Sequence, residues 1–485
     1  MTPPLAARTT RQFYSARRAV PVALLAALAT IAHPVAARGG DTLRVWFGSS
    51  APAPPYATWA TACRDLQAAV DAADSGDVVL VKADTALAYS SNSYRCIREC
   101  DLESNIFLRG VLFPKSGVNV AGEEGGPLPI LSGGDSIRTV LWVDGTRHTT
   151  IERLRLRDGG VLFDGVFDST DVVRHCVIES CRQMEGAGMW IKNEAAPIIE
   201  GNLFESNATD TVNHHQNGGA LSFLGSIPPR FPRIRGNVFR NNYAGRSGGA
   251  IRVKVASPII EDNLFEGNWA RSDGGAIIVQ GGRPKINRNV FVANRAEGRG
   301  GAIATANEFG FRSMDIRGNV FERDSAAAGG ALYLSHGGDH PAYLEAFDNT
   351  FVNCSASDPG TIVYIDGPRL ATQNIYLNRN IFFDAAQPAR ARIWATDEGI
   401  GAAIDSFDCN VFWPALEGGA TNGAGLEGTA TRSVWASPLF VPDEKRFGVD
   451  GEKSPCAARS SPCGCSIGAT LKWDGATPPG YQPRR

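Results

Sequence analysis

Apolar and polar residues recur in a fixed order between residues 197 and 334. Most copies read Pro-x-Ile-x-x-Asn-x-Phe and are followed, after a gap, by Gly-Gly-Ala and then Ile or Leu. The Phe position recurs every 26 to 35 residues and continues past this region, as Phe204, Phe239, Phe265, Phe291, Phe321, Phe351, Phe382 and Phe412. A period of this length predicts stacked structural repeats rather than a single globular core.

Short strands are the regular structure that the repeats favour. Ile251–Val253 and Ile277–Val279 are rich in β-branched residues and bounded by Gly or Pro. No copy contains a useful length of apolar residues with helical spacing. Each copy therefore predicts one coil of about three strands, in a stack of about eleven coils.

The columns of equivalent residues predict the inside of this stack, because parallel strands lie about 4.8 Å apart and each residue lies over its equivalent in the next coil. The Asn before each Phe is expected at a tight turn, in the left-handed backbone conformation, with its amide bonding the Asn above and below. The Gly-Gly pairs are expected at a corner with positive φ. The Phe column is expected to face inward, together with an aliphatic column formed by Ile199, Ile234, Ile260, Ile286 and Ile316.

These motifs resemble those of right-handed parallel β-helix proteins, the pectate-lyase-like superfold. The Gly-Gly-Ala motif, together with the Phe-x-x-Asn pairs such as Phe204–Asn207 and Phe239–Asn242, is similar to the repeats of polymorphic outer-membrane proteins. The resemblance implies an all-β, single-stranded right-handed parallel β-helix. It implies no single activity, because the superfold includes lyases, hydrolases, epimerases, adhesins and phage spikes.

The predicted organisation has four parts: a signal peptide over residues 1–37, a lead-in over 38–59, the β-helix over 60–413, and a closing segment rich in Gly, Pro and Cys over 414–485. Asp65–Ala73 is the one segment with helical apolar spacing, and Asp65 is a suitable N-cap. A solenoid needs a cap over its first open coil, so this helix is expected to close the N-terminal end.

The first 37 residues predict export. Four arginines flank the start of a 14-residue apolar stretch, and Val35-Ala36-Ala37 forms a small-residue cleavage site. A membrane anchor is the alternative, although the stretch is short for a span. Cleavage leaves 44 basic and 50 acidic residues, a net charge of −6, against 48 and 50 in the full chain. We therefore expect a secreted protein, extracellular or periplasmic in a bacterium, with no membrane span in the mature chain and no nucleic-acid partner.

Ten cysteines in an exported chain favour disulfide bonds. Free buried thiols are the main alternative, and the spacing of the cysteines gives little support to a metal site. The close pairs are Cys96 with Cys100, Cys176 with Cys181, and Cys456 with Cys463 or Cys465.

One basic element has a plain structural explanation. The segment from Arg230 to Arg235 resembles the Arg-x-Pro-x-x-Arg element of pectate lyases, but its last Arg falls in an outward column beside Glu200 and Glu261. A charge ladder of Glu200, Arg235 and Glu261 across three coils is the expected arrangement.

One acidic cluster could bind a cation. Asp164, Asp168 and Asp171 lie close together in the sequence, but their spacing matches no established Ca²⁺ loop. We expect these residues to shape turns, with a Ca²⁺ site as the alternative, and predict no other cofactor.

Loop lengths predict a binding site at one corner. Between the Ala of Gly-Gly-Ala and the next core residue, two middle coils need ten residues, whereas the coils after Ala302 and Ala331 need 14 and 15. Insertions in consecutive coils are expected to lie side by side. The candidate binding residues within them are Glu308, Phe309, Phe311, His336, Asp339 and His340.

These residue types suit a sugar ligand, because aromatic faces bind sugar rings and His/Asp pairs can perform acid–base work or hold a metal. Two solvated loops without a ligand are the plain alternative. The expected function is that of a monomeric protein that binds a polysaccharide or cell-surface glycan, without a nameable catalytic site. A polysaccharide lyase or glycoside hydrolase is the first alternative, and a structural or adhesive rod is the second.

Overall fold

The computed structural model describes residues 40–83, 89–90, 112–134, 139–165, 170–209, 216–225, 231–306, 313–335, 343–357, 362–366, 374–384, 393–395, 404–406, 408–413, 421–422, 456 and 468. Residues 1–39, which include the predicted signal peptide, form a separate unit outside this part of the chain. The fold below is that of residues 40–485.

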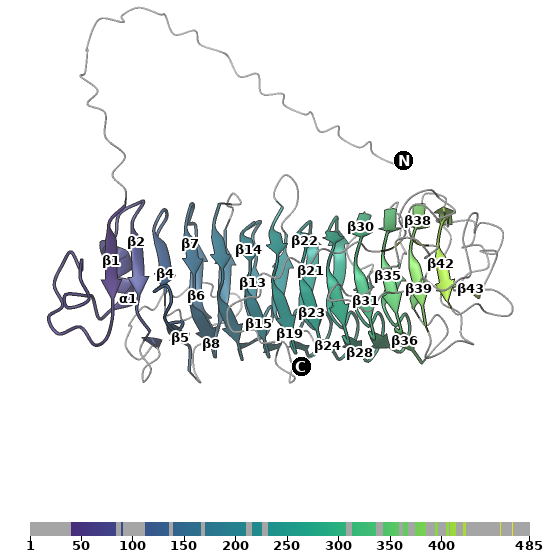
Figure 1. Cartoon of the computed structure of the whole chain (residues 1–485), viewed down its shortest axis with the longest axis horizontal. Helices are drawn as coiled ribbons and strands as arrows, with labels where there is room; N and C mark the ends of the chain where they lie inside the picture. The colour runs from purple at the N-terminus through teal and green to yellow at the C-terminus, as the bar shows by residue number, and fades with distance from the viewer. Residues whose placement is uncertain are drawn as a thin grey trace, which may run out of the picture. The chain divides into compact units, whose positions relative to one another are not determined.

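This unit is a stack of parallel strands wound into coils, as the repeats predict (Figure 1). Equivalent residues pair in register from coil to coil; Ile199 pairs with Ile234, and Ile234 with Ile260. The described strands form four sheets, named A to D here, of 13, 12, 11 and 7 strands.

Sheets A and B form two long faces. The strands of sheet A are β1 Thr42–Val45, β2 Val78–Val81, β4 Asn119–Gly122, β7 Thr150–Glu152, β10 Val172–Arg174, β14 Ile198–Glu200, β18 Arg233–Arg235, β22 Ile259–Glu261, β26 Lys285–Asn287, β30 Ser313–Arg317, β34 Tyr343–Phe347, β38 Asn374–Asn378 and β41 Ile404–Ser406. Those of sheet B are β3 Tyr89–Ser90, β5 Ile130–Ser132, β8 Arg155–Arg157, β11 Val177–Glu179, β15 Leu203–Glu205, β19 Val238–Arg240, β23 Leu264–Glu266, β27 Val290–Val292, β31 Val320–Glu322, β35 Thr350–Val352, β39 Ile381–Phe383 and β42 Val411–Trp413.

Sheets C and D complete the coils. The strands of sheet C are β6 Thr139–Asp144, β9 Gly160–Asp164, β13 Met189–Ile191, β17 Leu221–Leu224, β21 Ile251–Ala256, β25 Ile277–Gly282, β29 Ile303–Thr305, β33 Leu332–Ser335, β37 Val363–Asp366, β40 Ile393–Ala395 and β43 Thr421–Asn422. Those of sheet D are β12 Arg182–Gln183, β16 Ala208–Thr209, β20 Tyr243–Ala244, β24 Trp269–Ala270, β28 Arg295–Ala296, β32 Ser325–Ala326 and β36 Ser355–Ala356.

Each middle coil has four strands rather than about three, and they follow the order A, B, D, C. In one coil these are β22, β23, β24 and β25. The additional strand has two residues and follows a second Asn corner, as in Asn268-Trp269-Ala270. Its shortness explains why the pattern of apolar residues did not separate it from a turn.

The interior contains the predicted ladders. The Ile column is fully buried, and the Phe rings stack with centroids 4.8 to 5.1 Å apart from Phe204 to Phe412. The separation of the rings equals the strand spacing, so each ring lies flat on its equivalent in the next coil. These ladders belong to one continuous core.

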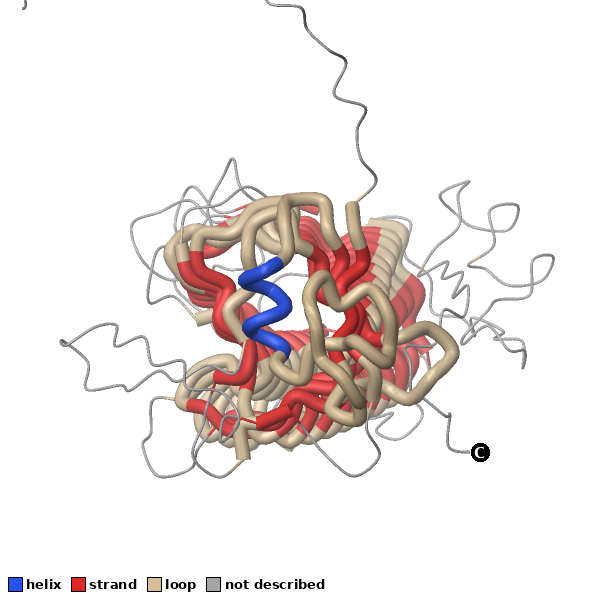
Figure 2. Tube along the Cα trace, turned by 90° about the vertical axis from the view of Figure 1, so that its left-hand side faces the viewer, coloured by secondary structure: helices blue, strands red, loops and turns tan. Residues whose placement is uncertain are grey.

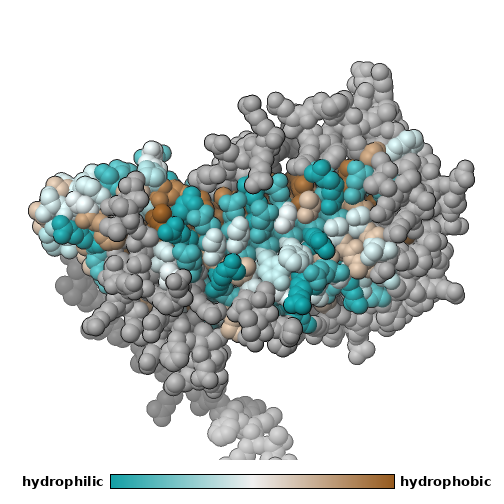
Figure 3. Space-filling view, turned by 90° about the horizontal axis from the view of Figure 1, so that it is seen from below, coloured by the Kyte–Doolittle hydropathy of each residue, from teal (hydrophilic) through white to brown (hydrophobic). Residues whose placement is uncertain are grey.

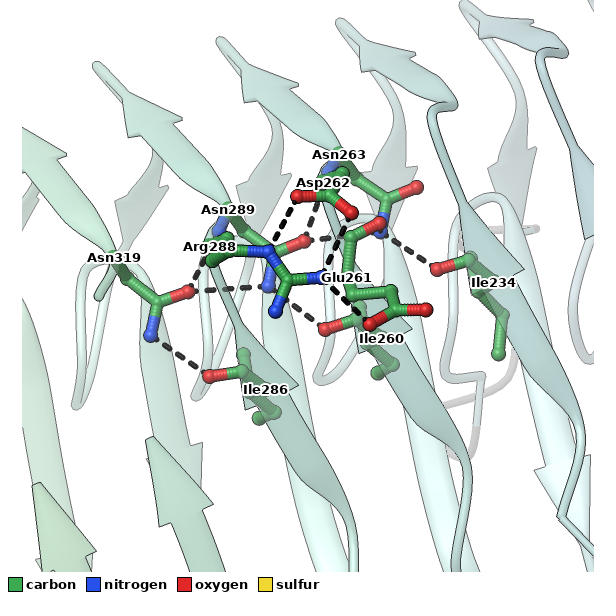
Figure 4. Close-up of polar contacts among 9 residues, drawn as sticks. All are labelled: Ile234, Ile260, Glu261, Asp262, Asn263, Ile286, Arg288, Asn289 and Asn319. Carbon is green, nitrogen blue, oxygen red and sulfur yellow. Dashed lines mark hydrogen bonds and ion pairs between the residues drawn. The ribbon is translucent and has the colours of Figure 1, made fainter. Parts of the chain in front are cut away.

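The Asn column forms a hydrogen-bonded ladder between sheets A and B (Figure 4). The amide nitrogen of Asn263 donates to the Ile234 carbonyl oxygen at 2.9 Å and to Asn289 Oδ1 at 3.0 Å. The predicted bonding is confirmed, but the predicted backbone is wrong: the left-handed residue is the one before each Asn, such as Asp262 (φ 57°) or Arg288 (φ 54°). The preceding residue makes the corner, so the Asn itself points its amide along the stack.

The Gly-Gly pairs lie at the corner before sheet C and have two separate reasons to be glycine. The first Gly of each pair has positive φ, as predicted; Gly274 has φ 68°. A Cβ on the second, Gly275, would clash with the carbonyl oxygen of Gly301 in the next coil. Close approach of the backbones, rather than φ, therefore excludes a side chain at the second position.

A helix closes the N-terminal end, as predicted. Helix α1 (Leu66–Ala72) buries Leu66, Ala69 and Val70, and lies across the end of the stack against β1 and β2 (Figure 2). The first strand of sheet A, β1, falls within the segment predicted as a lead-in and pairs with β2. Its alternation of half-buried and buried residues is that of a strand with one face on the core.

The N-cap of α1 gives a first prediction. The Asp65 carboxylate accepts a hydrogen bond from the Ala68 N–H at 2.9 Å. We expect Asp65→Ala to lower the free energy of unfolding by about 1 kcal/mol, and Asp65→Asn, which keeps an acceptor, to recover most of the loss. Equilibrium denaturation of the three proteins measures the difference; equal losses in both variants would contradict the capping role.

Candidate functional site

The six candidate binding residues predicted from loop length lie outside the described residues. The strands that lead into the two insertions, β29 and β33, are neighbours in sheet C. Thr305 and Ser335, near their ends, are hydrogen-bonded: Thr305 Oγ1 donates to the Ser335 carbonyl oxygen at 3.0 Å. The two insertions therefore start from adjacent coils, as their place in the repeat predicts.

The predicted charge ladder on the outside of sheet A is present in part, because Glu261 pairs with Arg288 and not with Arg235. Arg235 bonds Glu200 at 3.2 Å, as expected. Glu261 instead bonds Arg288 at 2.8 Å, and the same guanidinium holds Asp262 at 2.8 Å (Figure 4). Arg288 reaches both carboxylates because it occupies the corner equivalent to that of Asp262 in the next coil. The Arg235 side chain is 59% exposed, so its pair contributes little free energy and has no sign of a buried catalytic environment.

The acidic cluster does not converge in the part of the chain that the structure describes. Asp164 pairs with Lys192 at 2.9 Å, whereas Asp171 accepts a hydrogen bond from Thr146 Oγ1 at 3.0 Å; Asp168 lies outside the described residues. Across all described residues, no three His, Cys, Asp or Glu side chains gather as metal ligands. The same residues include no helix that is long and apolar enough to span a bilayer.

The predicted Cys176–Cys181 disulfide is absent: both residues are buried free thiols. They begin the two Asn columns, and their N–H groups donate to Asn202 Oδ1 at 2.9 Å and Asn207 Oδ1 at 3.0 Å. Because β11 separates the two corners, the thiols do not face each other. Burial raises the pKa of Cys176 to about 12, so this thiol is unreactive at neutral pH.

An exposed aromatic pair lies on the outside of sheet D. Tyr243 and Trp269 occupy paired positions in β20 and β24, with ring centroids 4.8 Å apart and planes inclined by 55°. Trp269 is 40% exposed, which is unusual for so large an apolar side chain. The alanines after them are buried, so alternation along each strand directs both rings outward.

Charged side chains surround this aromatic pair. Arg295 follows Trp269 in the register of sheet D and is exposed, as are Arg271 and Glu297. Partial burial raises the pKa of Tyr243; Arg271 opposes this change and Glu297 adds to it, which places both charges beside the phenol. We call Tyr243, Trp269, Arg271, Arg295 and Glu297 the aromatic platform. The face drawn in Figure 3 is largely hydrophilic where its residues are described, with small apolar patches.

Sequence reasoning missed the aromatic platform because it did not separate sheet D from a turn. A usable signal was present: Asn242-Tyr243-Ala244 and Asn268-Trp269-Ala270 repeat an Asn-x-Ala unit. In each Asn-x-Ala unit the Asn and the Ala are buried, so the residue between them must face solvent.

A polar cluster lies on the outer face of sheet C, next to the corner that precedes this sheet. The Glu185 carboxylate accepts hydrogen bonds from Arg252 at 2.8 Å and Ser222 at 3.1 Å, while Arg252 Nε donates to Gln280 at 2.7 Å. Burial raises the pKa of Glu185, and Arg252 opposes this change. Of the four side chains named in this cluster, one is a carboxylate. Its contacts tie four coils together.

Comparison with known proteins agrees with this architecture. The family model described as "Right handed beta helix region" matches residues 139–382. No curated protein matches the sequence. One similar solved structure is a mannuronic acid specific polysaccharide family 6 lyase from human gut microbiota, at 12% identity and a TM-score of 0.33, covering 75% of this chain and 87% of that chain. A similarity of this extent carries no information on activity. With half of its length matched by the family model, the chain belongs to the right-handed β-helix family.

Proposed function

We propose that the protein is a secreted glycan-binding β-helix whose aromatic platform contacts the sugar rings. The observation that carries this proposal is the exposed Tyr243–Trp269 pair with charges on its border. Aromatic faces bind the apolar faces of sugars, and guanidinium and carboxylate groups bond their hydroxyl or carboxylate groups. An acidic polysaccharide fits best, because two of the three flanking charges are arginines.

The experiment measures binding and cleavage together. The mature chain, residues 38–485, is incubated with acidic and neutral polysaccharides with and without Ca²⁺, and affinity is followed by calorimetry and Trp fluorescence. Ultraviolet-absorbing unsaturated ends would indicate a lyase, and new reducing ends alone a hydrolase; either would replace the binding proposal. If no polysaccharide of a broad panel is bound or cleaved, the result would favour the adhesive or structural rod.

Replacement of Trp269 tests the proposed binding site most directly. We expect Trp269→Ala to weaken binding by about 30-fold, or about 2 kcal/mol, as removal of a central aromatic contact does. Phe231→Ala is the matched control, since Phe231 is 38% exposed but lies outside sheet D. Equal affinity of the Trp269→Ala variant and the parent protein would exclude the aromatic platform as the binding site. The insertion residues Glu308 and His340 would then be the next to replace.

A further inference from the structure

The aromatic platform is the middle of a longer outward column on sheet D. The second residue of each strand in this sheet is buried, except in β32, where it is half-buried, so the first residue points outward. β24, β28 and β36 lie along one edge of the stack (Figure 1). The first residues pair in register from coil to coil and form a line along the stack, called the sheet D column here: Arg182, Ala208, Tyr243, Trp269, Arg295, Ser325 and Ser355.

Exposure separates the sheet D column from the outward residues of sheet B. Trp269 is 40% exposed, whereas the outward Leu264 of sheet B is 8% exposed. The backbone at Gly468 lies against another outward side chain of sheet B, that of Ile381. Both arginines of the sheet D column are exposed. The sheet D column is therefore a surface that a ligand can reach.

The two arginines of the column, Arg182 and Arg295, lie on either side of the aromatic pair. Neither guanidinium has an ion pair or a hydrogen bond within the part of the chain that the structure describes. Arginines on sheet B are paired instead; Arg155 Nη1 bonds Glu179 Oε2 at 2.7 Å. An exposed guanidinium without a carboxylate of its own chain is available for an anionic group of a ligand, which it can bind through two parallel N–H donors.

The spacing of the charges along the sheet D column fits an extended polymer. Arg295 lies one coil beyond Trp269, and Arg182 lies two coils before Tyr243. The four coil steps between the two arginines correspond to about 19 Å at the strand spacing. Ala208 occupies the position between Arg182 and Tyr243, and two serines continue the column beyond Arg295. Short side chains thus leave room for a ligand on both sides of the rings.

The flanks of the column add polar partners. On the side of sheet C lie Arg271 and Glu297, both exposed. On the side of sheet B the left-handed corner residues are Asn241, Gly267 and Ala293, which are small or carry an amide. Together with the two arginines of the column, three guanidinium groups and one carboxylate border the rings. This balance of charge favours an anionic ligand.

We propose that the sheet D column binds the interior of a linear anionic glycan whose chain runs along the stack. This inference rests on the proposed function, and it adds the class of the glycan, the direction of its chain and the length of the bound segment. Sugar rings lie on Tyr243 and Trp269, while Arg182 and Arg295 hold carboxylate or sulfate groups of the sugars on either side. With one sugar per coil, the segment from Arg182 to Arg295 holds about five sugars.

A single-stranded nucleic acid is also anionic and has flat rings, but the aromatic pair suits it less well. Successive bases stack on aromatic side chains. The planes of Tyr243 and Trp269 are inclined by 55°, so the two rings do not offer parallel faces to consecutive bases. Sugar units contact aromatic rings through their C–H faces, and consecutive units need not be parallel to one another. The geometry of the pair therefore favours a glycan.

Titration of the full chain with oligomers of increasing length tests the extended binding mode. Oligogalacturonates from dimer to octamer form the uronate series, with sulfated and neutral oligomers of the same lengths in parallel. We expect the affinity for one anionic series to rise by about tenfold or more from dimer to hexamer and then to level off, because the longer oligomers contact both arginines. The anionic series that binds more tightly identifies the charged group.

The same titrations test whether the interior of the glycan is bound. Chemical reduction of the chain end should leave the affinity of the octamer unchanged. Equal affinities of dimer and octamer would overturn the extended binding mode, and loss of binding after end reduction would show that the column binds a chain end.

Replacement of Arg182 tests the column outside the aromatic pair. We expect Arg182→Ala to weaken binding of the octamer by about fivefold, as loss of one exposed charge pair does. Binding of the dimer should not change, because a dimer on the rings does not reach Arg182. Arg233→Ala is the matched control, since it removes the same charge from an exposed residue on the outside of sheet A. Equal affinity of the two variants for the octamer would contradict a role of Arg182.

These outcomes distinguish the inference from the proposed function. If no glycan binds, the proposed function fails. If a glycan binds and Trp269→Ala weakens that binding, but neither oligomer length nor Arg182→Ala changes it, only the extended binding mode is wrong. Tighter binding of a single-stranded oligodeoxynucleotide than of every glycan oligomer would overturn the inference in favour of a nucleic acid.

Discussion

Asn263→Ala is expected to lower the free energy of unfolding by on the order of 3 to 5 kcal/mol, because it breaks the ladder between sheets A and B in the middle of the stack. Asn263 is fully buried, and its Oδ1 accepts hydrogen bonds from the Asn237 N–H at 2.9 Å and the Asn237 amide at 3.0 Å. Alanine would leave these donors without an acceptor, and a buried unsatisfied donor costs about 1 to 3 kcal/mol.

The measurement is guanidinium-induced unfolding, with circular dichroism and Trp fluorescence as independent probes. Lys285→Ala is the control, because Lys285 lies in sheet A one coil further along the stack and its side chain is exposed. We expect the control to change stability by less than about 0.5 kcal/mol. Similar losses in the two variants would show that the ladder does not carry the expected free energy.

Asp324→Asn is expected to stabilise the protein at neutral and alkaline pH. Asp324 continues the second Asn column, at the corner between sheets B and D, after Asn207, Asn242, Asn268 and Asn294. Its Oδ1 accepts from the Asn294 N–H at 2.8 Å, as an Asn would, but its Oδ2 is buried without a hydrogen-bond partner among the described residues. In Asn294 the equivalent atom is the amide nitrogen, which donates to the Phe265 carbonyl oxygen at 3.0 Å.

The carboxyl of Asp324 must therefore be neutral to complete the ladder. By the same register, the carbonyl oxygen that corresponds to that of Phe265 for Asp324 is the Phe291 carbonyl oxygen. A protonated Oδ2 would donate a hydrogen bond to it, as the Asn294 amide does to Phe265. Burial raises the pKa of Asp324 to about 8, despite opposing hydrogen bonds from Asn294. In the unfolded chain the pKa of an Asp is about 3.9.

The direction of the pH effect follows from these two values. Between about pH 4 and pH 8 the folded protein holds a proton at Asp324 that the unfolded chain has lost. The contribution of Asp324 to stability is thus fully present below about pH 4. It falls as pH rises, by up to about 1.4 kcal/mol per pH unit, until the folded carboxyl ionises near pH 8.

The Asp324→Asn substitution would remove this slope, since an amide does not titrate and donates at every pH. We expect the variant to exceed the parent protein in stability by on the order of 3 kcal/mol at pH 8 and to match it near pH 4. Urea unfolding at pH 4, 6 and 8 measures the difference, with the exposed Asp71→Asn as control. Parallel pH profiles for parent and Asp324→Asn would contradict a protonated Asp324.

The two ladders and the two cysteines at their start show where sequence reasoning succeeds and fails. Each column of Asn or Phe contributes one residue per coil. The period of these residues therefore predicts that equivalent residues stack. The sequence alone did not reveal that Cys176 and Cys181 occupy Asn positions. Their separation of five residues suits a disulfide as well as two corners. Only the intervening strand β11 decides between these arrangements.

The proposed binding surface depended still more on the tertiary structure. Loop length directed attention to the insertions after Ala302 and Ala331, which lie outside the described residues. Tyr243 and Trp269 are 26 residues apart in an otherwise regular repeat, and their two-residue strands are too short to show an alternation of apolar and polar residues. They become neighbours because the coils stack in register.

The sequence by itself determined the parallel β-helix, its inward Phe and Ile columns, the hydrogen bonding of its Asn column, its Gly-Gly corners and its capping helix. The columns and corners repeat with one period and depend on a residue's equivalent in the next coil, whereas the helix is indicated by its own apolar spacing and by Asp65 at its start. Only the tertiary structure decided which outward columns are exposed and which are covered, as for Trp269 and Leu264. Cover depends on segments distant in sequence, such as the chain at Gly468, and no local period encodes that contact.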